Sequence, residues 1–433
     1  MAGRDGATGS GERRLAESSV GRAYALVVAG ALSYAALTFI WFSLAAYLPT
    51  IIDDLGLSGT EAGVLAGAVP ATYIPLALFS GLAIDRIGPR RGLAVGLLLF
   101  GSAQVGRSVA AGFPSMLGLT LLLGTGATLI TFGLPKLVSV LFPPSGTGVP
   151  SSVYLVGSSS GTAAAFALGR PVVGPALGGW RPLFLYSGVA ALAYAAVWLV
   201  ASWGLGLRAV ERDGRTNGSG EDAAPGEGPT PGKDETAVPS VREDLVAVLT
   251  HRELRLVVAV GVAYLLIVHG MQGWLPTVLE SRGLDPDSAG QTTTLLVGAN
   301  VVGVLTVPGL ADRFDARRLA VVGSGAVAAA GVVGVIAGSA GPLAALGIVA
   351  AGYGVGGLSP LVRAIPPDLD GVGSRLTGTA VGLVFAVGEV GGFFGPVLVG
   401  SLYDVTGSYA PGLGVLVAGG LVAVLAGLRM QSV

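Results

Sequence analysis

The chain consists mainly of twelve long apolar runs, each close to the ~20 residues that a helix needs to cross the hydrocarbon core of a bilayer. We place these runs at residues 24–48, 62–84, 92–112, 115–141, 151–177, 182–204, 255–276, 289–311, 319–339, 342–364, 376–400 and 411–428. Backbone N–H and C=O groups cannot stay unpaired in lipid, so runs of this length must be helical. The sequence therefore predicts an all-α membrane protein with twelve transmembrane helices.

The composition excludes most soluble and catalytic classes of protein. Charged residues make up 12% and hydrophobic residues 52% of the 433 positions, whereas soluble proteins average about 25% charged residues. Cysteine is absent and only His251 and His269 are histidines, which excludes disulfides and zinc sites of the usual spacing. A net charge of −1 argues against a nucleic-acid partner. We find no phosphate-binding loop and expect neither a metal, nor a cofactor, nor enzymatic activity.

The two halves of the chain repeat each other at a constant offset of 227 residues, so that Leu48 matches Leu275 and Asp85 matches Asp312. Six helices followed by six in the same orientation is the parallel-repeat plan of secondary transporters, which place their substrate near the midplane between the halves. The segment between the halves is rich in Gly, Pro, Glu and Asp, and we expect it to be disordered. The predicted divisions are a cytoplasmic N-terminal tail at 1–23, a six-helix bundle at 24–204, a cytoplasmic linker at 205–253 and a second six-helix bundle at 254–433.

Lys and Arg residues are distributed unevenly between the two sides of the predicted bundle. One side carries twenty of the 25, the other carries only Arg181 and Arg282, and Arg107, Lys136 and Arg170 fall inside runs. Positively charged loops remain in the cytoplasm. With an even number of crossings, both termini lie on one side, so we expect both to be cytoplasmic in a multi-pass protein of the cell membrane.

Two motifs connect this plan to a known family. The stretch Gly81–Arg91 resembles the loop signature between the second and third helices of the major facilitator superfamily, and residues 174–179 resemble the glycine-proline motif of its fifth helix. Three further segments are similar to the neighbourhood of cyanate permeases and nitrate/nitrite porters: Pro135–Pro143, Gly273–Pro276 and Tyr403–Tyr409.

The resemblance implies a secondary active transporter that works by rocker-switch alternating access. We expect it to move a small organic or inorganic anion together with a proton, as a monomer in the lipid bilayer. One alternative is an exporter of amphipathic compounds. The other is a membrane sensor that does not transport, which the absence of an output domain in the sequence disfavours.

Glu389 is the only acid well inside a predicted run, and about 1.5 Å of rise per residue places it near the midplane. A charge in the membrane costs several kcal/mol unless it is paired or hydrated. We expect Glu389 to exchange a proton during transport, with Tyr73 as its partner, because the resemblance implies that helices two and eleven meet. The alternative is an acid that only tethers helices.

The cations and polar residues inside the runs are candidates for substrate binding. Arg170 and Lys136 can attract an anion to a cavity between the halves, although Lys136 can instead extend to the cytoplasmic interface. We expect Arg107 to be a scaffold residue. His269 and Gln272 share one helical face, which the resemblance places beside the cavity. Weaker candidates for contacts with the substrate are Asn300 and Tyr353.

The loop signature and its repeat supply a predicted conformational latch. In the family, this cluster holds the two bundles together on the cytoplasmic face and favours the outward-open state. We expect Asp85 to face the positive N-terminus of the eleventh helix; the alternative is that the cluster only sets topology. The full predicted latch comprises Asp85, Arg86, Arg90, Arg91, Asp312, Arg313 and Arg375.

Two tryptophans are expected at the outer membrane interface. Trp180 and Trp274 lie at the ends of runs, where aromatic rings anchor helices at the level of the lipid headgroups.

Overall fold

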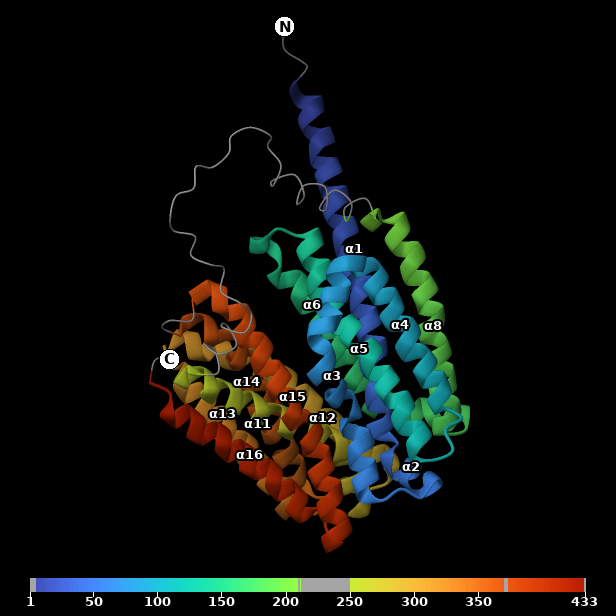
Figure 1. The fold of residues 1–433 in the computed structure, drawn as a ribbon, viewed down its shortest axis with the longest axis vertical. Helices are drawn as coiled ribbons and strands as arrows, with labels where there is room; N and C mark the ends of the chain where they lie inside the picture. Colours follow the sequence, from blue (N-terminus) through green and yellow to red (C-terminus); the bar gives the residue numbers. More distant parts are fainter. Residues whose placement is uncertain (1–4, 209–210, 212–249, 370–372, 432–433) are drawn as a thin grey trace, which may run out of the picture.

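The computed structural model describes residues 5–208, 211, 250–369 and 373–431 of the chain. Within these ranges all regular structure is helical, and Figure 1 shows two bundles of long helices side by side. Most of the predicted linker and the first four residues lie outside the described ranges.

The N-terminal bundle is α1 to α8. Its helices are α1 (Asp5–Ala46), α2 (Leu48–Leu55), α3 (Gly59–Ile87), α4 (Pro89–Arg107), α5 (Phe113–Leu141), α6 (Gly148–Ala164), the π-helix η2 (Ala165–Val173), α7 (Gly174–Leu177) and α8 (Trp180–Gly204). The C-terminal bundle is α11 to α16. Its helices are α11 (Arg252–Ser281), α12 (Pro286–Arg313), α13 (Arg317–Ala337), α14 (Pro342–Ala364), α15 (Gly373–Thr406) and α16 (Ala410–Arg429). Short 3₁₀ turns η1 (Pro144–Gly146) and η3 (Pro366–Asp368) complete the two bundles.

Most of these helices are long and apolar enough to cross a bilayer. Nine of the described helices meet that requirement, and α3, which bends by 65°, makes a tenth. The helix α4 is not among them because it begins with Pro89-Arg90-Arg91, and α6 is only 17 residues long and serine-rich. When α6, η2 and α7 are taken as one interrupted crossing, the order of helices matches the predicted twelve-helix plan.

The repeat seen in the sequence reappears as matching turns in the two bundles. Gly56 after α2 and Gly283 after α11 both have positive φ, at 61° and 92°, a conformation that glycine adopts without steric cost. Two residues later, Ser58 caps α3 and Asp285 caps α12, each accepting a hydrogen bond from the backbone N–H three residues on. That bond lowers the pKa of the Asp285 carboxyl. The offset of 227 residues is therefore a repeat of local structure.

The fifth crossing is interrupted, whereas the sequence predicts one continuous helix over 151–177. Pro171 lies inside η2, where it has no N–H to donate and its ring crowds the preceding turn. The wider π-helical turn accommodates that clash, and such turns frequently mark functional sites. As a consequence, the chain presents Arg170 toward the C-terminal bundle, as described below.

The two bundles meet tightly at one end, which we call the far side; α1 begins and α16 ends at the other, which we call the terminal side. Gly59 and Gly63 of α3 lie so close to α15 that an added Cβ would be 2.6 Å from the carbonyl oxygens of Gly400 and Pro396. Near the far side, Gly290 of α12 similarly approaches η2, at 2.6 Å from a carbonyl oxygen. These pseudo-equivalent contacts close the far side by direct packing of backbones.

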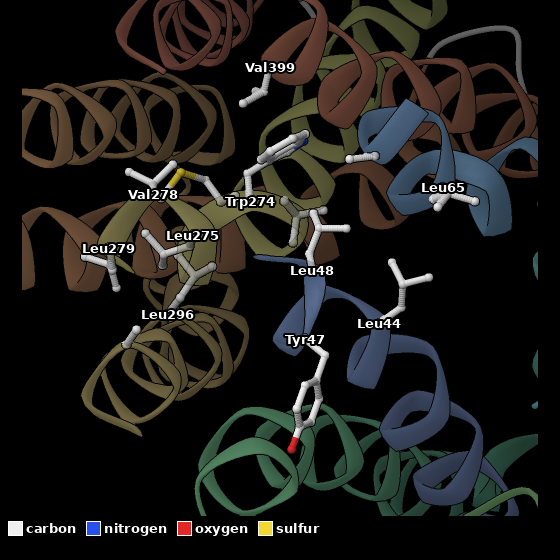
Figure 2. Packing of buried hydrophobic residues seen from close by; sticks show 14 of the residues in the cluster. Leu44, Tyr47, Leu48, Leu65, Trp274, Leu275, Val278, Leu279, Leu296 and Val399 are labelled. Carbon is white, nitrogen blue, oxygen red and sulfur yellow. The ribbon is translucent and has the colours of Figure 1, made fainter. Parts of the chain in front are cut away.

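A hydrophobic core continues across the far side between α1, α2, α3, α11 and α15. Figure 2 shows Leu48 of α2 beside Trp274 of α11. Trp274 is fully buried and donates from Nε1 to the Pro396 carbonyl at 2.8 Å, so its prediction as an interface anchor is wrong. Trp180 is also buried, at 3% exposed, and donates to Asp54. Trp180 is therefore not an exposed interface anchor either, because its ring packs within the N-terminal bundle against Phe184 of its own helix.

Candidate functional site between the bundles

A histidine and a glutamate of the C-terminal bundle meet where that bundle faces the N-terminal one. His269 of α11 and Glu389 of α15 approach to 3.8 Å between Nε2 and Oε2, with side chains 10% and 12% exposed. Within the described ranges, Glu389 Oε2 has no hydrogen-bond partner. A lone buried carboxylate is costly, whereas a protonated acid, or a carboxylate beside an imidazolium, is much less so. The pair can therefore hold one proton in the interior.

Aromatic rings of the N-terminal bundle cover this pair. The Trp41 ring of α1 stacks on His269, with ring centres 5.5 Å apart and planes at 14°. The Tyr73 ring of α3 lies 6.3 Å from the Trp41 ring, and its hydroxyl pairs with that of Thr131 at 2.8 Å. Tyr73 therefore hydrogen-bonds within its own bundle.

A narrow cavity lies beside the pair, with walls from α1, α3, α4, α5 and α11. Its void is about 10 Å³, which is barely room for one water molecule. The side chains of Arg107, Thr120 and His269 reach it, and the other lining residues are aliphatic, aromatic or glycine. The aromatic part of the wall is Trp41 and Phe42, whose rings stack at 5.1 Å.

Arg107 ends α4 and is 1% exposed. Its Nη1 donates to Gln104 Oε1 at 3.1 Å, and Gln104 in turn donates to the hydroxyls of Ser43 and Ser187, each at 3.3 Å. Its guanidinium carbon lies 4.8 Å from the centre of the Phe184 ring. Nε and Nη2 have no hydrogen-bond partner, and no ion pair recorded for the described residues includes this arginine. Arg107 is thus held in place but its charge is not neutralised.

Arg170 joins the two bundles at the far side. Its guanidinium pairs with Glu280 of α11, with N–O distances of 2.7 and 2.8 Å, and also donates to the Ala46 carbonyl. The two side chains are 6% and 16% exposed. Tyr47, whose hydroxyl points toward the green η2 segment in Figure 2, donates to the Arg170 carbonyl at 3.5 Å. The predicted substrate-binding cation therefore already has a carboxylate partner on the opposite bundle.

Asp404, near the end of α15, adds a second polar contact across the far side. Its carboxylate accepts hydrogen bonds from the Gly59 and Thr60 N–H groups, both at 2.7 Å, and from the Thr60 hydroxyl at 2.6 Å. These groups form the N-terminus of α3, where the helix dipole favours a negative charge. Together with the Arg170 contact, this interaction fastens the closed far side.

On the terminal side, Asp85 and Arg90 of the predicted latch pair within their own bundle. Asp85 binds Lys136 of α5 at 2.8 Å, with side chains 58% and 42% exposed. Arg90 donates to the Ser202 hydroxyl at 3.1 Å and to the Leu199 carbonyl of α8. Lys136 therefore lies with the loop signature rather than in the cavity.

The repeat of the signature is arranged in the same way. Arg317 pairs with Asp312 at 3.0 Å and with Asp368, and Arg318 donates to the Leu428 carbonyl of α16 at 2.7 Å. Arg313 lies over the Phe314 ring. The side chain of Arg375 lies outside the described part of the chain.

The remaining predicted residues lie in the C-terminal bundle. Gln272 and Asn300 line a second small cavity between α11, α12 and α14, and Tyr353 accepts a hydrogen bond from Thr306 at 3.3 Å. His269 and Gln272 are three residues apart but face different cavities. The predicted binding residues thus fall into several groups, and only His269 reaches the cavity between the bundles.

Sequence reasoning missed Glu280, Asp404 and the exposure of Arg107 to the cavity. Glu280 lies just beyond the predicted seventh run, so it is not recognised as an intramembrane acid. The sequence offers one usable signal: Asp404 is in the segment Tyr403–Tyr409, which carries part of the resemblance to cyanate permeases and nitrate/nitrite porters.

Comparison with known proteins agrees with this architecture. Residues 30–396 match the family model described as Major Facilitator Superfamily. A 3-(3-hydroxy-phenyl)propionate transporter of Escherichia coli K12 is 27% identical over 391 residues, covering 88% of each chain. A putative tartrate transporter of Agrobacterium vitis is 24% identical over 383 residues, covering 84% of this chain and 80% of that one.

Solved structures show the same fold. A bacterial homologue of the human lysosomal transporter Spinster, in an inward-facing and unoccupied conformation, aligns with a TM-score of 0.69 at 16% identity. The alignment covers 94% of this chain and 96% of that one.

Proposed function

This chain belongs to the major facilitator superfamily, and we propose that, as a secondary transporter of that family, it takes up a small organic anion together with a proton. The observation that carries the proton coupling is the enclosed pair of Glu389 and His269 beside the cavity between the bundles. The names of the relatives, a hydroxyphenylpropionate and a tartrate transporter, support an organic acid as the substrate. They favour organic acids over the cyanate or nitrate that the narrower resemblance suggests.

The orientation that we propose places both termini in the cytoplasm. It is supported by the two arginines of the far side, Arg181 and Arg282, because each of them binds backbone carbonyls at the end of a helix. Arg181 donates to the carbonyls of Ser108 and Ala110 after α4, and Arg282 donates to the Ser339 carbonyl after α13 at 2.8 Å. These exceptions to the charge bias stabilise helix ends, where positive charge is favoured. In this orientation the closed far side faces the outside of the cell.

The proton and the anion are coupled through charge in this mechanism. A carboxylate substrate that enters beside an ionised Glu389 meets a like charge in a poorly screened site. A proton taken up by the Glu389 and His269 pair removes that repulsion. Arg107 on the cavity wall and Tyr73, 6.3 Å from Trp41, are further charged or titratable groups near the pair. Anion and proton therefore bind together and cross as the bundles rock.

The test is uptake of labelled 3-(3-hydroxyphenyl)propionate and tartrate into proteoliposomes, with and without a pH gradient, and with nitrate and cyanate for comparison. We expect accumulation of an organic acid when the outside is acidic. Glu389→Gln should abolish this accumulation while leaving exchange of labelled for unlabelled substrate largely intact, because a glutamine cannot carry the proton.

Glu253→Gln is the matched control. Glu253 lies at the start of α11 and accepts a hydrogen bond from the Gln431 N–H at 3.3 Å, a contact that glutamine can keep. Equal loss of accumulation and exchange in folded Glu389→Gln would show a structural role for this residue. Efflux against a gradient would show that the protein is an exporter instead.

A further inference from the structure

We propose that Arg107 binds the carboxylate of the transported anion, and that this anion is an aromatic acid whose ring lies against Trp41 and Phe42. The inference rests on the proposed function and names the chemical class of its substrate. The sequence suggests that Arg170 binds the anion and that Arg107 is a scaffold residue, and this inference exchanges the two roles.

The three cations inside the predicted runs differ in what neutralises them. Lys136 is paired with Asp85 and Arg170 with Glu280. Arg107 is more deeply buried than either, and no ion pair recorded for the described residues neutralises it. A guanidinium is always charged in proteins, and a buried charge without a counterion is strongly disfavoured. The site therefore lacks one negative charge, which a substrate can supply.

The unused donors of Arg107 belong to a residue that lines the cavity between the bundles. Nε and Nη2 have no partner within the described chain, whereas Nη1 is fixed by Gln104. Two adjacent N–H groups of a guanidinium match the two oxygens of a carboxylate. Both Arg107 of the N-terminal bundle and His269 of the C-terminal bundle line this cavity. A carboxylate bound here would be next to the residues that hold the proton.

The rest of the wall selects an aromatic substrate over a hydroxylated one. The Trp41 and Phe42 rings are nearly parallel, with planes at 7°, and together give the cavity an apolar aromatic surface. Thr120 already donates its hydroxyl to the Met116 carbonyl at 2.7 Å. A polyhydroxy diacid such as tartrate needs several donors and acceptors, and a second cation, that this wall does not offer. Planar rings gain contact with such a surface.

The void is too small for an aromatic acid, as expected if the binding site is contracted in this conformation. With about 10 Å³ of room, the cavity admits an aromatic acid only after the bundles move apart. The closed far side lies directly above it, so the cavity would open toward that side. A site that is formed in one state and collapsed in the other binds its substrate on the first side and releases it on the second.

The test is calorimetric titration of the purified full chain with 3-phenylpropionate, its uncharged amide, hexanoate and tartrate. We expect 3-phenylpropionate to bind more tightly than the other three. Arg107→Gln should weaken its binding by about 30-fold or more, as when one partner of a buried charge pair is removed, and should leave the weak binding of the amide unchanged. Arg107→Lys should restore part of the affinity. Trp41→Leu should reduce the preference for 3-phenylpropionate over hexanoate.

Arg282→Gln is the control, because Arg282 contacts backbone carbonyls at the end of α13 and lies outside the cavity. Its affinity should match that of the wild type. If folded Arg107→Gln binds 3-phenylpropionate as tightly as the wild type does, the assignment of Arg107 is overturned while uptake of organic anions stands. Where Arg107→Gln does not fold, equal affinity of the wild type for 3-phenylpropionate and for its uncharged amide overturns the assignment instead. Tighter binding of tartrate or hexanoate overturns the aromatic class. If the wild type binds none of the acids, the proposed function itself fails.

Discussion

At the scale of single residues, the role of a buried charge depends on its partner. Arg107 and Arg170 look alike in the sequence, since both are cations inside apolar runs. The structure separates them because Glu280, 110 residues away from Arg170, pairs with it, and no local pattern contains that information. Glu389 stands out from sequence alone because an acid at midplane depth is rare. The pairing of His269 with Glu389 could not be predicted, because the sequence of neither helix determines how the two helices are rotated against each other.

The ion pair across the far side gives a prediction at this scale. Arg170→Gln should leave Glu280 buried without its partner, a loss of about 3–5 kcal/mol for the closed far side. Opening the far side hydrates that charge, so the mutant should populate the far-side-open state. The double variant Arg170→Gln with Glu280→Gln should return toward wild-type behaviour.

The measurement is the labelling rate of Thr120→Cys by an impermeant maleimide, in a chain whose wild type has no cysteine. Thr120 lines the cavity and is 2% exposed, so it reacts only when the far side opens. Faster labelling in both the single and the double variant, to the same extent, would contradict coupling between the two charges.

At the scale of elements, the sequence predicts well where the helices lie along the chain, but it does not predict where a helix is interrupted. The predicted run 62–84 lies inside α3 (Gly59–Ile87), and 319–339 overlaps α13 (Arg317–Ala337), because hydropathy and turn residues limit both. The run 151–177 is predicted as one continuous helix, yet it forms three segments. The π-helical turn depends on Pro171 and on what lies across the bundle interface, and hydropathy records neither.

The contact between α3 and α15 can be tested with one methyl group. Gly63→Ala would place a Cβ 2.6 Å from the Pro396 carbonyl oxygen, so the helices must move apart, at a cost of about 1–3 kcal/mol. We expect faster maleimide labelling of Thr120→Cys, because the substitution destabilises the state in which the far side is closed. Gly81→Ala, on the same helix with nothing within 4 Å of the added Cβ, should leave labelling unchanged. A similar effect of both substitutions would mean that helix stability, not packing, controls the far side.

At the scale of the whole molecule, the closed far side carries polar contacts between the two bundles. There, Arg170 and Asp404 each bind partners on the opposite bundle. On the terminal side, Asp85 and Arg317 pair within their own bundles. The ion pairs of Asp85 and Arg317 therefore lie within the bundles while the far side is fastened, as alternating access requires of one end state.

The loop signature provides the last prediction, which concerns the balance between the two end states. In this structure Asp85 pairs with Lys136, but both are largely exposed, so the pair contributes about 0–1 kcal/mol. We propose that in the opposite state Asp85 faces the N-terminus of α15, a contact of about 0.3–2 kcal/mol. Asp85→Asn weakens that contact and should slow labelling of Thr120→Cys from the far side. Lys136→Gln removes only the competing pair and should speed labelling, by a few-fold in each case. The opposite signs identify a latch, because a cluster that only sets topology would leave both rates at the wild-type value.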